Sequence, residues 1–254
     1  MIGIVLAAGY ATRLYPLTSN FPKPLLDVGG KAIIDWILED IDSCGQVDSY
    51  VVISNHKYLG YFDNWRKQCK LLRPVTIIDD GSTNNENRLG AVKDIAFAID
   101  HLKLNDDLVV LAGDNLLDFS ISAFLDYFYK KQSTCIMRHH ESDIEKLRKT
   151  GVALVDNSDK VLGMEEKPID PKSSWAVPPF YIYEKAVIPM IAKGIQNGVP
   201  TDAPGSLITW LCTKCTVYAM EMPGNRYDIG DIQSYQSIKQ HYKGISKMHL
   251  ALKV

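Results

Sequence analysis

Long apolar runs are missing from this sequence. None of its 254 residues lie in an uninterrupted apolar stretch that approaches the roughly 20 residues needed for a membrane helix. The first ten residues have neither the basic start nor the cleavage pattern of a signal peptide. We therefore expect a cytoplasmic protein with no membrane partner.

An excess of charge of either sign is also missing. The chain has 28 Lys and Arg residues against 30 Asp and Glu residues, for a formal net charge of −2. Nucleic acids and anionic membrane surfaces favour proteins with a broad basic face. This balance argues against a nucleic-acid partner, and any phosphate-binding site has to be local.

Cysteine is scarce, and the common glycine-rich nucleotide motifs are absent or incomplete. The five cysteines are odd in number, which excludes a full disulfide framework, and the pair Cys212 and Cys215 has no second pair or nearby His to complete a zinc site. Only Gly9 matches the dinucleotide pattern G-x-G-x-x-G, and no G-K-[ST] exists for a P-loop. The glycine pattern therefore disfavours an NAD-dependent oxidoreductase.

Apolar strands alternating with amphipathic helices are present in the first half of the chain. With 46% hydrophobic and 23% charged residues, the composition is that of a globular protein. Such alternation is typical of βαβ units and a parallel sheet, so we predict an α/β fold. The predicted strands are Ile2–Leu6, Tyr50–Ile53, Val75–Ile78 and Leu108–Ala112, and the predicted helices are Ile33–Ile41, Tyr58–Cys69 and Ala91–Ile99.

A looser pattern follows residue 113 and indicates a mixed sheet. Strands are predicted at Thr134–Met137, Val152–Val155, Val161–Met164 and Ala176–Tyr183, and helices at Ile121–Tyr129, Lys185–Lys193 and Ile232–His241. No Pro/Ser linker separates the halves. We predict a single domain over 1–254, with a nucleotide-binding half (1–113), an acceptor-binding half (114–235) and a C-terminal helix and tail (236–254).

The loop after the first strand has small residues where open α/β sheets bind ligands. Leu6–Thr18 reads LAAGYATRLYPLT, and Phe21–Leu26 reads FPKPLL. Small side chains let backbone N–H groups approach a base or phosphate closely. Arg13 and Lys23 have no acidic neighbour in the chain before Asp27, so a triphosphate would supply the missing partner.

These two segments resemble the signature of the sugar-phosphate nucleotidyltransferases, the family that includes glucose-1-phosphate thymidylyltransferase. The resemblance covers roughly residues 1–235 and implies a Rossmann-like, three-layer nucleotide-diphospho-sugar transferase fold with a mixed, mainly parallel central sheet. It implies a short family member without a β-helix domain, and assembly as a homo-oligomer. By resemblance, the nucleotide-binding residues are Leu6, Ala7, Ala8, Gly9, Thr12, Arg13, Lys23, Gly90 and Asp114.

Two later carboxylates complete the catalytic set that the resemblance implies. Asp114 follows the apolar strand in VVLAGDN, and Asp228 lies in NRYDIGD. In the family, carboxylates at these positions bind Mg²⁺, a hard cation that prefers oxygen ligands. The resemblance therefore implies Asp114 and Asp228 as metal ligands and Arg13, Lys23 and Asp114 as catalytic residues. Asp231 is expected to cap the following helix.

The acceptor residues are likewise carried over from the resemblance. The family uses a Gly and a Glu-Lys-Pro stretch to hold the sugar phosphate, and these fall on Gly151, Glu166 and Lys167. The segment around Trp175 also resembles the thymidylyltransferases. We expect these four residues to bind the acceptor.

Two departures from the family pattern leave the substrate open. Pro178-Pro179 stands where Thr or Ser and then Gly are typical, and the base-reading Gln is absent from Asp79–Ala91, although Leu89-Gly90 is kept. The base is therefore open among dTTP, UTP, CTP and GTP.

The reaction expected is Mg²⁺-dependent transfer of a nucleotide from a nucleoside triphosphate to a sugar 1-phosphate, with release of pyrophosphate. Two alternatives stay open. The first is a cytidylyltransferase acting on a non-sugar phosphate such as phosphocholine. The second is a catalytically silent, nucleotide-binding regulatory relative.

Overall fold

This computed structural model describes residues 1–246, which divide into two units. Apolar strands form the core of each unit. Unit 1 consists of Met1–Arg88, Ala112–Ala123 and residues 223–246, and unit 2 consists of Leu89–Leu111 and Phe124–Met222. Each unit therefore draws on separate stretches of the chain.

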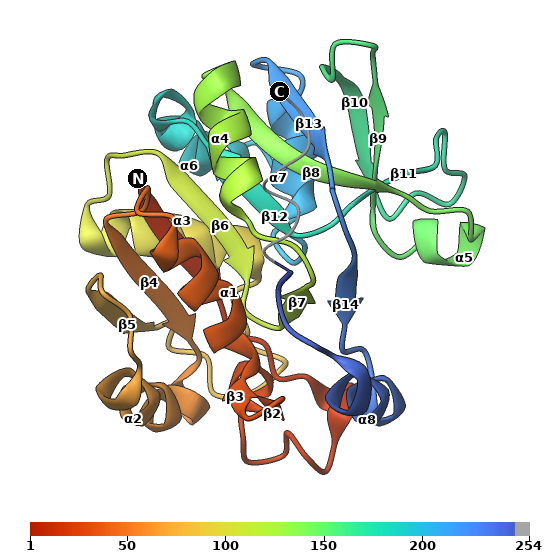
Figure 1. Cartoon of the computed structure of the whole chain (residues 1–254). Coiled ribbons are helices and arrows are strands. Elements are labelled where there is room, and N and C mark those ends of the chain that lie inside the picture. Colours follow the sequence, from red (N-terminus) through yellow and green to blue (C-terminus); the bar gives the residue numbers. More distant parts are fainter. Residues whose placement is uncertain (247–254) are drawn as a thin grey trace. The chain divides into compact units, whose positions relative to one another are not determined.

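Unit 1 is built on a parallel sheet with strand order β1–β4–β5 (Figure 1). Its strands are β1 (Ile2–Leu6), β4 (Ser49–Ser54) and β5 (Val75–Asp79), and its longer helices are α1 (Ile33–Ser43) and α2 (Leu59–Gln68). β1 and β4 are mostly buried apolar runs, as expected for strands inside a parallel sheet, whereas β5 at the edge is only partly buried. The predicted strands and helices in this part of the chain are confirmed.

Short elements complete unit 1 around the loops that follow β1. They are the 3₁₀ turns η1 (Thr12–Leu14), η2 (Lys23–Leu25) and η3 (His56–Tyr58), the hairpin β2 (Asp27–Val28) and β3 (Lys31–Ala32), the antiparallel pair β7 (Asn115–Leu117) and β14 (Arg226–Asp228), and α8 (Ile232–His241). Asp231 caps α8, because its Oδ1 accepts a hydrogen bond from the Ser234 N–H at 2.7 Å. The predicted cap is confirmed.

Unit 2 contains a mixed sheet with strand order β10–β9–β11–β8–β12–β6. β12 is antiparallel to β6 and β8, whereas β13 runs parallel to β8. Figure 1 shows β9 and β10 as a green hairpin. The strands are β6 (Leu108–Ala112), β8 (Thr134–His140), β9 (Gly151–Val155), β10 (Val161–Glu166), β11 (Trp175–Val177), β12 (Phe180–Tyr183) and β13 (Val217–Glu221). The α/β class with a mixed sheet is confirmed.

The helices of unit 2 are α3 (Ala91–Leu102), α4 (Ser122–Lys131), α5 (Ile144–Leu147), α6 (Ile188–Gln196), which follows the turn η4 (Lys185–Val187), and α7 (Gly205–Leu211). Three of them, α3, α4 and α6, follow predicted amphipathic segments, whereas α5 and α7 were not predicted. One prediction was wrong: Ala176–Tyr183 is not one strand, because Pro178-Pro179 interrupts it between β11 and β12. Proline lacks the N–H that a continuous strand would donate.

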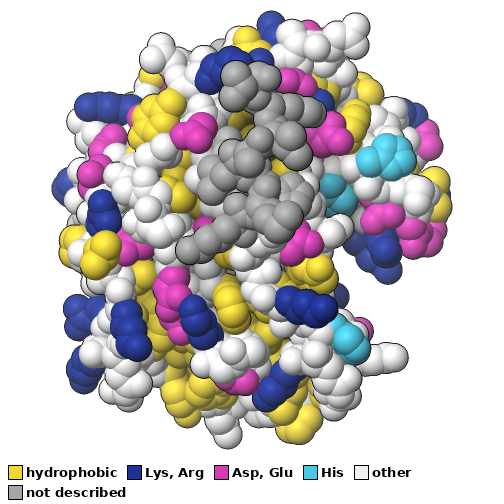
Figure 2. Space-filling view, in the orientation of Figure 1, with side chains coloured by type: hydrophobic (Ala, Val, Ile, Leu, Met, Phe, Trp, Pro, Cys, Tyr) yellow, Lys and Arg dark blue, Asp and Glu magenta, His cyan; other side chains and the backbone are white. Residues whose placement is uncertain are grey.

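The surface agrees with the balanced charge of the sequence. On the face shown in Figure 2, Lys and Arg side chains are interspersed with Asp and Glu side chains. None of the helices in the described chain combines the length and apolar character that crossing a bilayer requires. Of the predicted C-terminal helix and tail, residues 247–254 lie outside the described residues. The single-domain organisation stays a prediction.

Candidate functional site

Hydrogen bonds anchor the backbone of the small-residue loop after β1, and the space beside its Gly9 is open. The Ala7 N–H donates to Ile53 O at 3.0 Å, and the Asn55 side chain donates to Ala8 O at 2.9 Å. Ala7 and Ala8 are buried, whereas Gly9 is exposed, and a Cβ added there would meet no described atom within 4 Å. The backbone is thus fixed while the space beside Gly9 stays open.

Thr12 and Arg13 are presented by a turn whose third residue anchors it. Both side chains are exposed on η1, and Leu14 beside them is 1% exposed. Ala11 enters the turn in the left-handed conformation, with φ of 46°. Hydrogen bonds from Ser234 lower the pKa of Asp231, and the Arg13 charge adds to this effect. Arg13 therefore carries an exposed positive charge at this end of unit 1.

Lys23 is buried against a carboxylate. It lies on η2 between Pro22 and Pro24, is 7% exposed, and its Nζ lies 2.6 Å from Asp114 Oδ2. Its sequence neighbours offer no acidic partner, but the fold brings one from 91 positions away. Two of the three predicted catalytic residues, Lys23 and Asp114, are therefore in direct contact.

The pairing of β7 with β14 sets the position of the second predicted metal ligand, Asp228. In this antiparallel register Asp228 is opposite Asn115, the residue that follows Asp114. Burial raises the pKa of Asp114, but the charges of Lys23 and Arg226 outweigh this effect and bring the pKa below its usual value. Asp114 is therefore an anion at neutral pH.

The donor set of these two carboxylates fits a hard divalent cation. Asp114 Oδ1 accepts from Asn115 at 2.8 Å and Oδ2 accepts from Lys23, which leaves a further lone pair on each oxygen. The Asp228 side chain is 56% exposed. Within residues 1–246, no three His, Cys, Asp or Glu side chains form a group that could hold a metal ion. A cation here would need additional oxygen ligands, as Mg²⁺ takes from phosphates.

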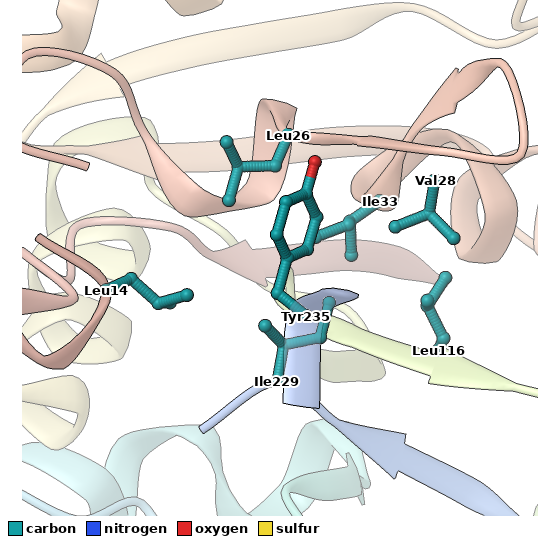
Figure 3. Packing of buried hydrophobic residues seen from close by; sticks show 7 residues of the cluster. All are labelled: Leu14, Leu26, Val28, Ile33, Leu116, Ile229 and Tyr235. Carbon is teal, nitrogen blue, oxygen red and sulfur yellow. The ribbon is translucent and has the colours of Figure 1, made fainter. Parts of the chain in front are cut away.

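An apolar cluster fixes all of these charged residues in unit 1. Figure 3 shows its seven members: Leu14, Leu26, Val28, Ile33, Leu116, Ile229 and Tyr235. Each charged residue lies within three positions of a member in the chain, since Arg13 precedes Leu14 and Asp228 precedes Ile229. The Tyr235 hydroxyl also donates to Asp27 O at 2.8 Å. The cluster therefore packs the loop after β1 together with β7 and the residue that follows β14, next to the charged residues in the chain.

In unit 2, Glu166 and Gly151 are cross-strand partners. They are paired in the β10–β9 register. A Cβ at Gly151 would lie 3.2 Å from Glu166 Oε2, and a Cβ at Gly205 would collide with the same carboxylate. Burial raises the pKa of Glu166, and the Lys167 charge opposes the rise. Among the described residues none donates a hydrogen bond to this carboxylate, so its acceptor capacity is available.

Lys167 is exposed beside Glu166 and has a strained backbone. Its φ is +50°, a left-handed conformation that is uncommon for residues other than glycine. The Lys167 N–H donates to Thr150 O at 3.0 Å, which holds the turn. Such conformations gather at ligand sites, where the surrounding structure enforces them.

Trp175 is engaged within unit 2. The Arg138 guanidinium lies 4.5 Å from the centre of its ring, and the His140 ring packs edge-on at 5.9 Å. The Trp175 side chain is half-buried. Contact between Trp175 and an acceptor stays a prediction.

Gly90 has a local structural role at the start of α3. Its φ is +87°, and a Cβ there would lie 2.5 Å from Thr201 O. The Ala91 and Val92 N–H groups donate to the backbone carbonyls of Asp202 and Thr201 at 3.2 and 3.0 Å. These two donors are therefore already satisfied, and nucleotide binding by Gly90 stays a prediction.

Three residues of these sites were missed by the sequence interpretation. Asn115 and Arg226 contact each other in unit 1, where Arg226 Nη1 donates to Asn115 Oδ1 at 2.6 Å. Arg226 had no signal of its own in the sequence, because β14 has only three residues and its pairing with β7 shows only in the structure. Gly205 had no local signal, since its meaning depends on Glu166.

Comparison with known proteins places this geometry in a family. The family model for nucleotidyl transferases matches residues 2–244. Glucose-1-phosphate adenylyltransferase of Fervidobacterium nodosum is 27% identical over 248 residues, which cover 92% of this chain and 59% of that protein. The chain spans about half the length of the curated relatives that it matches.

Solved structures share the fold. A Bacillus anthracis protein assigned as glucose-1-phosphate thymidylyltransferase, in complex with sucrose, superposes with a TM-score of 0.77 at 24% identity, covering 94% of both chains. UDP-glucose pyrophosphorylase complexed with UDP-glucose gives a TM-score of 0.78 at 19% identity, covering 95% of this chain and 97% of that one. With the predicted fold confirmed and a family model that matches nearly its whole length, the chain belongs to the nucleotidyl transferase family.

Proposed function

We propose that the chain is a nucleotidyltransferase that joins a nucleoside triphosphate to a sugar 1-phosphate and releases pyrophosphate. The observation that carries this proposal is the contact between Lys23 and Asp114, with Asp228 opposite Asn115 in the adjacent strand pair. A cation and two carboxylates at the carboxyl ends of strands suit a polyphosphate and a divalent cation. The proposal places the chain in the cytoplasm, where nucleoside triphosphates are supplied.

The reaction is an in-line displacement at the α-phosphorus. An oxygen of the acceptor phosphate forms a bond to the α-phosphorus, the bond from this phosphorus to the bridging oxygen breaks, and pyrophosphate leaves. The acceptor phosphate is ionised at neutral pH, so no side chain has to remove a proton. Lys23 and Arg13 would stabilise the charge that develops on the α-phosphate oxygens.

Asp114 and Asp228 would hold Mg²⁺, which supplies charge neutralisation of the phosphates when bound. Asp114 meets this role because it is ionised at neutral pH and accepts hydrogen bonds from Lys23 and Asn115, which fix the orientation of its carboxylate. Orientation of ligands by such partners is a common requirement of metal sites.

A sugar acceptor is favoured by the environment of Glu166. Its half-buried carboxylate lies between Gly151 and Gly205 and can accept hydrogen bonds from hydroxyl groups. The adjacent Lys167 would pair with the acceptor phosphate. A phosphocholine headgroup has no hydroxyl hydrogens to donate, so it would leave this carboxylate without hydrogen bonds.

The test is a screen of dTTP, UTP, CTP, GTP and ATP against several sugar 1-phosphates and phosphocholine, followed by pyrophosphate release. Release that requires a sugar 1-phosphate, and is lost in Asp114→Asn, supports the proposal. Release only with CTP and phosphocholine would instead support a cytidylyltransferase. Nucleotide binding without pyrophosphate release in any combination would support a silent regulatory relative.

A further inference from the structure

Arg226 lies at the end of a chain of hydrogen bonds that reaches the proposed metal site. Arg226 Nη1 donates to Asn115 Oδ1 at 2.6 Å, and Asn115 Nδ2 donates to Asp114 Oδ1 at 2.8 Å. Lys23 holds the other oxygen of Asp114 at 2.6 Å. Both oxygens of this carboxylate therefore have a donor, and one of the donors depends on Arg226.

The strand pairing explains why Arg226 reaches Asn115. Asp228 is directly opposite Asn115, and Arg226 is two residues from Asp228 on the same strand. Residues two apart share a face, and diagonal neighbours across an antiparallel pair are within reach of long side chains. The Arg226 side chain is 20% exposed and Asn115 is 2% exposed, so little water competes for the contact.

Donor and acceptor chemistry fixes the orientation of the Asn115 amide. A guanidinium has only donors, so the Asn115 oxygen has to face Arg226. The amide nitrogen is then turned toward Asp114, whose ionised carboxylate has only acceptors. Without Arg226 the Asn115 oxygen loses its donor, and only the contact with the Asp114 carboxylate is left to hold the amide in this orientation.

We propose that Arg226 is a positioning residue for the metal site, acting through Asn115 to set the orientation of the Asp114 carboxylate. This inference rests on the proposed function, because it takes Asp114 as a metal ligand. Arg226 also lies 4.0 Å from Asp228 through Nη1 and Oδ2, so its charge faces both carboxylates. The positive charge of Arg226 alone would repel a bound cation and weaken its binding. Orientation of the Asp114 carboxylate by Arg226 would strengthen cation binding, so the two effects have opposite signs.

The test is Mn²⁺ binding to the protein without substrates, followed by the electron paramagnetic resonance signal of free Mn²⁺. The variants are Arg226→Met, Asn115→Ala and the double variant. Loss of a residue that orients a metal ligand typically weakens metal binding by about 10–100-fold. We expect that loss in both single variants, with little further loss in the double variant, because the residues act in one chain.

Tyr227→Phe is the matched control. Tyr227 is on the same strand, and its hydroxyl donates to Asp118 at 3.2 Å, away from Asp114. We expect unchanged Mn²⁺ affinity in Tyr227→Phe and partial rescue in Arg226→Lys, which keeps the charge and loses the planar fork.

Mn²⁺ binding by Arg226→Met that is as tight as in the wild type, or tighter, would overturn the proposal. This holds even if the variant is less stable to heat, because a purely structural role would lower stability and leave metal affinity unchanged. Absence of Mn²⁺ binding by the wild-type chain would overturn both the metal ligands and this role of Arg226. Intact Mn²⁺ binding together with no pyrophosphate release in the substrate screen would refute the proposed function alone.

Discussion

Replacement of Lys23 by Met separates the charge of this residue from its packing. The Lys23 side chain is 8% exposed, and Met keeps most of its apolar stem. The change therefore leaves little cavity, and its main effect is that Asp114 loses the cation 2.6 Å from its Oδ2. The expected cost depends on how well water can replace that cation.

Two limits bound the magnitude. Breaking a fully buried ion pair costs about 3–5 kcal/mol, and a surface pair contributes about 0–1 kcal/mol. The Asp114 side chain is 36% exposed, so water partly replaces Lys23 and we expect a loss of about 1–2 kcal/mol. For a chain of this size the corresponding fall in Tm is about 2–8 °C.

The loss of folding stability in Lys23→Met should be larger at neutral pH than at acidic pH. Burial raises the pKa of Asp114, and Lys23 and Arg226 lower it below its usual value of 3.8, so the pair stabilises the fold above that value. This stability is lost as the pH falls through the lowered pKa. The difference between wild type and variant should therefore be largest near pH 7 and shrink below about pH 4.

Urea denaturation at several pH values and pyrophosphate release measure the two consequences of Lys23→Met. Loss of a residue that stabilises transition-state charge typically lowers kcat by about 10²–10³-fold. Lys31→Met is the matched control, because Lys31 pairs with Glu39 and both side chains are about 40% exposed. Equal losses of stability in the two variants, a pH-independent loss, or an unchanged kcat in Lys23→Met would refute the reasoning.

Two further predictions concern Glu166. Gly205→Ala places a Cβ against the Glu166 carboxylate and should raise the KM for the sugar phosphate by about tenfold, because one hydrogen-bond acceptor is displaced. Gly163→Ala is the control, since a Cβ there meets no described atom within 4 Å, and its KM should not change. Equal KM changes in the two variants would contradict this prediction. Burial raises the pKa of Glu166 above 4.5, so the wild type should lose more stability than Glu166→Gln as the pH rises from about 4 to 7. Urea denaturation midpoints measured across this pH range test the difference. Parallel midpoint curves for the two proteins would contradict the prediction.

Local signals were sufficient for most elements of the fold. β1, β6 and α8 begin and end where their apolar patterns predict, and Asp231 caps α8 through a hydrogen bond to a backbone only three residues away. These features depend on neighbours in the chain. The interruption at Pro178-Pro179 was equally local, and the proline chemistry that causes it was visible in the sequence.

Long-range pairing could not be predicted in the same way. β7 and β14 are three residues each, too short for a period-2 pattern, and residues 226–228 find their partners more than 100 positions earlier. The family resemblance suggested that Asp114 and Asp228 act together, but only the register shows Asn115 opposite Asp228. For the same reason Lys23 looked unpartnered in the sequence and proved to be paired.

Unit 1 also has a consequence for the order in which the protein can mature during synthesis. Its apolar cluster needs Leu14, from the loop after β1, and Tyr235, from a helix that is synthesised more than 200 residues later. All of unit 2 is therefore translated after the first 88 residues and before β14 and α8, which complete the cluster. At about 5–20 residues per second this interval is on the order of ten seconds, during which Leu26 and Ile33 lack part of their cover and a chaperone could bind them.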